Sequence, residues 1–177
     1  MSQRRGEPFK GVWPTIHESA WIHESAVIIG DVTIGPDVSI WPNVTLRGDE
    51  GKIVIGAGSN IQDGSTIHMT GGESDTHVGA RVTVGHNCIL HGCVIGDDCL
   101  IGMGSLLMDN ARIGDGCYVG GGTLVPPNKV VAPGQFILGN PFKVLRPVGE
   151  RERGWIAYAW QHYVDNAKAY AARDAAK

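Results

Sequence analysis

Two histidines lie five residues apart in the segment VGHNCILHG (residues 84–92), which is otherwise largely apolar. Imidazole nitrogens are common metal ligands in proteins, and they also act as general bases near neutral pH. A third histidine, His68, ends the upstream segment NIQDGSTIH. What these three side chains can do together depends on the elements that carry them and on how those elements stack.

The chain is organised in repeats of six residues. IHESAW at position 16 is followed directly by IHESAV, and Ile, Leu or Val then returns at nearly every sixth position as far as Ile137. Periods of two or 3.6 residues do not give this pattern, so ordinary hairpins and amphipathic helices fit poorly. A hexapeptide repeat is typical of short strands joined by tight turns, three to a coil, in a parallel β-helix. We therefore predict an all-β solenoid.

The repeat stops after GNPFKVLRPV, where a different pattern begins. One face of a helix is indicated by the spacing of Ile156, Trp160, Tyr163, Ala167 and Tyr170. We predict a β-helix domain over residues 1–146 and a C-terminal α-helix over 147–177. The helix is expected to pack along the solenoid, as a covering element without chemistry.

Composition excludes several classes of partner. The formal charge is -3 with basic and acidic residues mixed along the chain, which argues against nucleic acid and anionic membranes. No apolar run approaches the roughly 18 residues of a membrane span, and no secretory leader is evident, so we expect a cytoplasmic protein. The four cysteines form no CxxC pair, and three of them, Cys88, Cys99 and Cys117, occupy small inward positions of the repeat. They are expected to be reduced core thiols.

The phase of the repeat brings two of the histidines together. His68 and His91 each follow a core residue directly, and they should lie one coil apart, about 4.8 Å in backbone spacing. Two imidazoles at that spacing can share one metal ion. His86 has a different phase and lies near a corner, so it can join them only from a neighbouring subunit of a cyclic trimer. The alternative is that these histidines are simply packed in the core or at an interface.

Four segments of the chain resemble the γ-class carbonic anhydrase family: LRGDE (46–50), NIQDGSTIH (60–68), VTVGHNCILHGC (82–93) and IGMGS (101–105). The resemblance implies a homotrimer and a left-handed β-helix. Crossover geometry alone would favour a right-handed β-helix. It further implies that His68, His86 and His91 bind a divalent metal, zinc in the first place, with iron(II) or cobalt also accepted. Metal-bound hydroxide would then hydrate CO2 reversibly to bicarbonate, a lyase reaction.

The same resemblance assigns further site residues. Gln62 is similar to the family's glutamine that hydrogen-bonds the metal-bound water. Arg47, Asp49 and Asp63 match polar residues beside it, although salt bridges that lock a trimer would look the same. Glu50 matches a glutamate near the metal.

The segment after the first histidine departs from the family. Active members carry a long acidic loop with a proton-shuttle glutamate, whereas here MTGGESDTH (69–77) is short. Glu73 or Asp75 could replace the shuttle.

Two other functions fit the same solenoid, because fold does not decide function. Hexapeptide acyltransferases act on coenzyme A thioesters with a single catalytic histidine between subunits, and GNPFKVLR (139–146) is similar to their C-terminal end. A non-catalytic, metal-stabilised trimeric scaffold is the third possibility.

Overall fold

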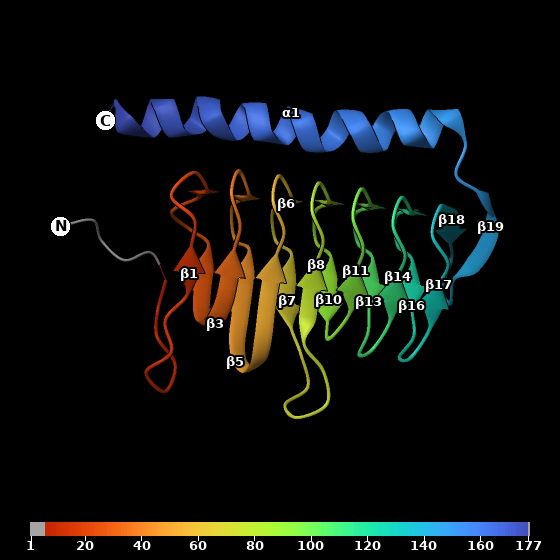
Figure 1. The fold of residues 1–177 in the computed structure, drawn as a ribbon, viewed down its shortest axis with the longest axis horizontal. Helices are drawn as coiled ribbons and strands as arrows, with labels where there is room; N and C mark the ends of the chain where they lie inside the picture. The colour runs from red at the N-terminus through yellow and green to blue at the C-terminus, as the bar shows by residue number, and fades with distance from the viewer. Residues whose placement is uncertain (1–5, 177) are drawn as a thin grey trace.

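The computed structural model describes residues 6–176, and these form a parallel, left-handed β-helix of about 7 turns followed by one helix (Figure 1). The predicted fold class is therefore confirmed. The outermost residues of the two predicted domains, 1–5 and 177, lie outside the described part of the chain.

One sheet wraps around two sides of the coil because β3 (Val27–Ile34) and β5 (Thr45–Ile55) continue around a corner. The first side, called here the histidine side, continues with β7 (Thr66–His68), β10 (Ile89–His91), β13 (Leu106–Leu107) and β16 (Leu124–Val125). The second side contains β1 (Thr15–Ile16), β8 (Thr76–Val78), β11 (Val94–Ile95), β14 (Arg112–Ile113) and β17 (Val130–Val131).

The third side of the coil is a separate sheet. Its strands are β2 (Trp21–Ile22), β4 (Ser39–Ile40), β6 (Asn60–Ile61), β9 (Thr83–Val84), β12 (Leu100–Ile101), β15 (Tyr118–Val119), β18 (Gln135–Leu138) and β19 (Lys143–Pro147). All neighbours in this sheet are parallel except β18 and β19, which are antiparallel and close the C-terminal end. Such three-sided coils leave only the two ends of the stack to be capped.

The core is built from aligned copies of the same repeat position. On the histidine side Leu46, Ile67, Leu90 and Leu107 are in register from one coil to the next, and all four are 0% exposed. The small inward positions are buried as well. Cys88, Cys99 and Cys117 are free thiols in the core, as predicted, and burial raises the pKa of the Cys88 thiol to about 11.

Helix α1 (Glu150–Ala175) runs back along the solenoid and packs against the third side (Figure 1). Ile156 and Ala167 of the predicted face are buried, and Val164 is buried beside them. Trp21 and Trp41 from the solenoid pack against Tyr163 and Tyr170 of the helix, with ring centroids 5.1 to 5.3 Å apart. Those ring contacts fix the C-terminal half of the helix to the first coils.

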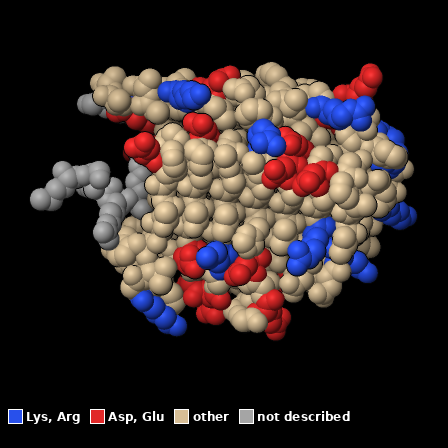
Figure 2. All heavy atoms as spheres, viewed as in Figure 1, with Lys and Arg blue, Asp and Glu red and all other residues tan. Residues whose placement is uncertain are grey.

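Charged side chains of both signs are interspersed around the periphery of the face in Figure 2, and neither sign gathers into one large patch there. Among the described residues, no helix is both long enough and apolar enough to cross a bilayer.

Candidate functional site

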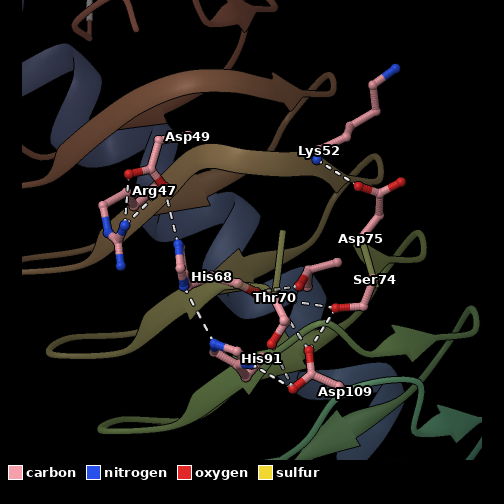
Figure 3. A network of polar contacts seen from close by, with 10 residues as sticks. Arg47, Asp49, Lys52, His68, Thr70, Ser74, Asp75, His91 and Asp109 are labelled. Carbon is pink, nitrogen blue, oxygen red and sulfur yellow. Dashed lines mark hydrogen bonds and ion pairs between the residues drawn. The ribbon is translucent and has the colours of Figure 1, made fainter. Parts of the chain in front are cut away.

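Two parallel strands of the histidine side bring His68 and His91 together. Both residues end their strands, β7 and β10, and the register pairs them directly across the two coils. His68 Nδ1 lies 3.3 Å from His91 Nε2, and the two side chains are 15% and 31% exposed. The juxtaposition predicted from the phase of the repeat is therefore confirmed (Figure 3).

Each of the two histidines has a carboxylate on its other ring nitrogen. His68 Nε2 is 3.0 Å from Asp49 Oδ1, and His91 Nδ1 is 3.0 Å from Asp109 Oδ2. Arg47 Nη1 donates to both oxygens of Asp49, at 2.9 and 2.7 Å. The resulting chain Asp49–His68–His91–Asp109 extends along the axis of the solenoid (Figure 3).

The two carboxylates are ionised at neutral pH. Partial burial raises the pKa of Asp49, but hydrogen bonds from Arg47 and His68 outweigh that effect and hold the pKa below its usual value. Asp109 behaves alike: burial raises its pKa, and hydrogen bonds from Ser74 and His91 bring the pKa below the usual range.

These carboxylates determine where the imidazole protons lie. An ionised carboxylate only accepts hydrogen bonds, so His68 carries its proton on Nε2 and His91 carries its proton on Nδ1. The two nitrogens that face each other are then lone pairs, unless a proton or a cation lies between them. The structure thus concentrates acceptor atoms at one point between two strands.

The separation of these two nitrogens fits a metal ion. Two nitrogens bound tetrahedrally at about 2.0 to 2.1 Å are about 3.3 to 3.4 Å apart, and the observed separation is 3.3 Å. A carboxylate on the outer nitrogen is also the usual orienting partner of a metal-bound histidine. His68 and His91 therefore fit the part of two ligands.

His86 lies elsewhere on the chain, in the turn between β9 and β10 at a corner of the coil. Its Nδ1 is 3.0 Å from Asp63 Oδ2, so the contact with that carboxylate does not occupy Nε2. Both side chains are nearly half exposed. Within residues 6–176 no three His, Cys, Asp or Glu side chains converge as a metal's ligand set. One chain therefore carries two separate parts of the predicted site.

Gln62 lies with Asp63 and His86 rather than with the histidine pair. It directly follows β6 on the third side, is 5% exposed, and donates through Nε2 to Asn60 Oδ1 at 3.1 Å. Asn60 in turn donates to Thr83 Oγ1. The predicted site residues thus divide into a pair-bearing half with Arg47, Asp49, His68 and His91, and a corner half with Gln62, Asp63 and His86.

Glu50 packs on the loop that follows His68, where a side chain at Gly71 would collide with it. With Glu73 and Asp75, Glu50 lines an open polar cavity of about 710 Å³. Arg112 and His77 of the second side also line that cavity. The acidic residues expected near a metal therefore lie over the neighbouring side of the coil, across the loop from the histidine pair.

Sequence reasoning missed Asp109 as well as the loop residues that contact it. Asp109 is 18 residues after His91, one residue beyond a full coil, because the register pairs Leu90 with Leu107. A spacing close to one coil was the available signal, because residues about one coil apart lie near each other.

Known proteins share this architecture. The model of the bacterial transferase hexapeptide (six repeats) family matches residues 14–48 and 92–127. The chain is 42% identical over 159 residues to the carnitine operon protein CaiE of Salmonella agona, which spans 90% of this chain and 80% of that protein. The CaiE protein of Escherichia coli O157:H7 is 41% identical over 157 residues, 89% of this chain and 80% of its own. The chain belongs to the hexapeptide-repeat transferase family.

Solved structures agree with that assignment. A hexapeptide transferase family protein from Anaplasma phagocytophilum is 40% identical with a TM-score of 0.89, over 93% of this chain and 96% of its own. A Bacillus cereus protein, described provisionally as an acetyltransferase, is 38% identical with a TM-score of 0.91, over 93% and 95%. These relatives support the wider family of the predicted resemblance, whereas carbonic anhydrase activity stays a prediction.

Proposed function

We propose that this protein transfers or hydrolyses the acyl group of a coenzyme A thioester, in a homotrimer, where the histidine pair of one subunit faces His86 of the next. Two things support the proposal: the kinship with transferase-family proteins and CaiE, and the Asp109–His91 contact of 3.0 Å. That contact is the observation that carries it, because a carboxylate on Nδ1 prepares Nε2 to accept a proton.

The reaction follows from that geometry. An acceptor hydroxyl, amine or water adds its oxygen or nitrogen to the thioester carbonyl carbon and gives its proton to His91 Nε2. The bond between carbon and sulfur then breaks, and the thiolate of coenzyme A takes a proton back. Asp109 holds the imidazole in the accepting tautomer throughout, and it stabilises the imidazolium.

A divalent metal would be a separate use of the same residues, because His91 Nε2 can bind a metal or accept a proton but cannot do both at once. His68 and His91 would hold it with His86 of a neighbouring subunit, zinc in the first place, with iron(II) or cobalt as the alternatives. When bound, such an ion polarises a carbonyl oxygen and lowers the pKa of water. The chain's own contribution is positional: Asp49, Asp63 and Asp109 each hold one imidazole by its outer nitrogen.

Hydration of CO2 is the second candidate, and one observation favours it. All three predicted ligands have a carboxylate on one ring nitrogen, at 3.0 Å in each case. An acyltransferase needs a single general base, so three oriented histidines are more than acyl transfer requires. Water addition to CO2 and to a thioester both place an oxygen nucleophile on an electrophilic carbon, so one site can suit either substrate.

A paired assay separates these functions. Purified protein, both metal-free and loaded with zinc or iron(II), is tested for thiol release from acyl-coenzyme A with and without hydroxyl or amine acceptors, and for CO2 hydration by stopped flow. The four cysteines are buried, so a thiol-reactive dye reports the released coenzyme. His91→Ala should lower the rate of the observed reaction, thiol release or CO2 hydration, at least about 100-fold.

The matched control is Asp115→Asn, an exposed carboxylate in the turn after β14 that accepts from the backbone of Asp97. Thiol release that His91→Ala abolishes and Asp115→Asn retains supports the acyl proposal. If only CO2 hydration is observed, and His91→Ala abolishes it while Asp115→Asn retains it, the second candidate replaces the acyl proposal. If neither the metal-free nor the fully metal-loaded protein shows either activity, and metal binds stoichiometrically, a non-catalytic metal-stabilised scaffold is the function that remains.

A further inference from the structure

The loop between His68 and β8 is tied to the histidine pair through one carboxylate. Ser74 Oγ donates to Asp109 Oδ1 at 2.6 Å. The backbone N–H and the hydroxyl of Thr70 approach the two Asp109 oxygens at 3.3 Å each. His91 Nδ1 contacts Asp109 from the other direction. Asp109 therefore receives three donors from the loop and one from the site (Figure 3).

This arrangement leaves little freedom for Asp109. Its side chain is 20% exposed, and both oxygens have partners among the described residues. A carboxylate with several fixed donors has one favoured orientation. The imidazole that contacts its Oδ2 then has one favoured orientation as well.

Gly92 makes the close approach of loop and carboxylate possible. It adopts a φ of +62°, a conformation that side chains rarely take, and a Cβ there would collide with Ser74 Oγ and Asp109 Oδ1. Its backbone N–H donates to Thr76 Oγ1 at 2.9 Å, and that hydroxyl donates to the carbonyl of His68 at 2.7 Å. The end of the loop is thus bonded to the strands of both histidines.

We infer that Asp109 is the positioning residue of His91, and that the loop at 69–75 determines its orientation through Ser74 and Thr70. The inference rests on the proposed function in taking the histidine pair as the site. It gives the loop a role that does not involve proton transfer by Glu73 or Asp75. The loop instead fixes the tautomer and direction of His91 by way of Asp109.

Nitrogen-15 NMR of the histidine rings tests this directly. In the full-length protein His91 should show the tautomer with its proton on Nδ1. In Asp109→Asn the amide can donate to Nδ1, which permits the proton to move to Nε2, so the His91 ring signals should shift toward the other tautomer. Zinc affinity, measured by competition with a coloured chelator, should fall about 10- to 100-fold.

Ser74→Ala is the second variant, because it removes one loop donor and leaves the carboxylate in place. It should weaken zinc binding in the same direction but less than Asp109→Asn, with the His91 signals broadened or shifted. Asp115→Asn is the control and should change neither readout. If Asp109→Asn does not fold, Ser74→Ala still tests whether the loop reaches His91.

The possible outcomes distinguish the inference from the proposed function. A changed His91 tautomer in Asp109→Asn without any turnover in the wild type would support the positioning role and reject the enzymatic proposal. Unchanged ring signals and zinc affinity in a folded Asp109→Asn, or in Ser74→Ala if that is the only folded variant, would overturn the positioning role, even with full wild-type activity. Equal effects in Asp115→Asn would overturn it too.

Discussion

Mixed trimers test whether the histidine pair and His86 meet across subunits. The perturbation is a mixture of His86→Ala and His91→Ala chains, each defective in a different part of the site. In the proposed trimer every site takes the pair from one subunit and His86 from its neighbour. A site is intact only when the histidine pair comes from a His86→Ala chain and His86 comes from a His91→Ala chain.

The expected recovery follows from counting. With equal amounts and random assembly, each condition is met half the time, so about one quarter of the sites are intact. At a three-to-one mixture the fraction falls to about 0.19, because it varies as the product of the two chain fractions. If all ligands came from one chain, every chain would carry a defect and no site would recover at any ratio.

The assay unfolds and refolds the two variants together, verifies mixed trimers by native mass spectrometry, and measures tight zinc binding at limiting metal. Separately refolded variants and wild-type protein treated alike are the references. Recovery near one quarter, with a maximum at equal mixing, supports the shared site. Verified mixed trimers without recovery would refute the reasoning, because the geometry would then place His86 away from the neighbouring pair.

Three further predictions concern the framework. Leu107→Ala, at a fully buried position in register with Leu90, should lower the free energy of unfolding by about 2 to 5 kcal/mol in urea titrations; a smaller loss would mean that neighbouring coils collapse around the cavity. Trp41→Ala removes the ring between Tyr163 and Tyr170 and should cost about 3 to 5 kcal/mol, with faster hydrogen exchange confined to α1 and the first coils; uniform loss of protection would contradict a local role. The hydrogen bond from Arg146 lowers the pKa of Glu152 from 4.5 to about 2, so the pair stabilises the start of α1 above about pH 4.5, and that stabilisation is lost as the pH falls toward 2. Glu152→Gln should flatten the acid dependence of urea stability in that window, and an unchanged slope would show that other carboxylates control it.

Most of the fold could be predicted from the sequence because the hexapeptide repeat is a direct consequence of the packing. Each core position such as Leu90 must meet its counterpart one coil away, so the hexapeptide count is kept within the strands and turns and extra residues are confined to loops. Counting three repeat steps with the inserted loop set aside placed His68 beside His91. The C-terminal helix was predictable from its apolar spacing, although its contact with Trp21 and Trp41 was not, since those residues belong to distant coils.

The remainder of the site depends on irregular segments. Asp109 lies in a turn, and it matters because the loop after His68 bends back to reach it through Ser74. The repeat count is interrupted in this loop, so neither the contact nor the placement of Glu50 on the loop follows from it. Tertiary folding of a short insertion determined both.

The chain Asp49–His68–His91–Asp109 has a mechanical consequence for the solenoid. These residues come from four successive coils, and each contact links one coil to the next. Unfolding that starts at either end of the solenoid must break these side-chain contacts as well as backbone hydrogen bonds when it reaches the four coils. The middle of the stack should therefore open as one cooperative unit, and its amides should exchange last. The residues proposed to carry the chemistry therefore also link the successive coils of the solenoid.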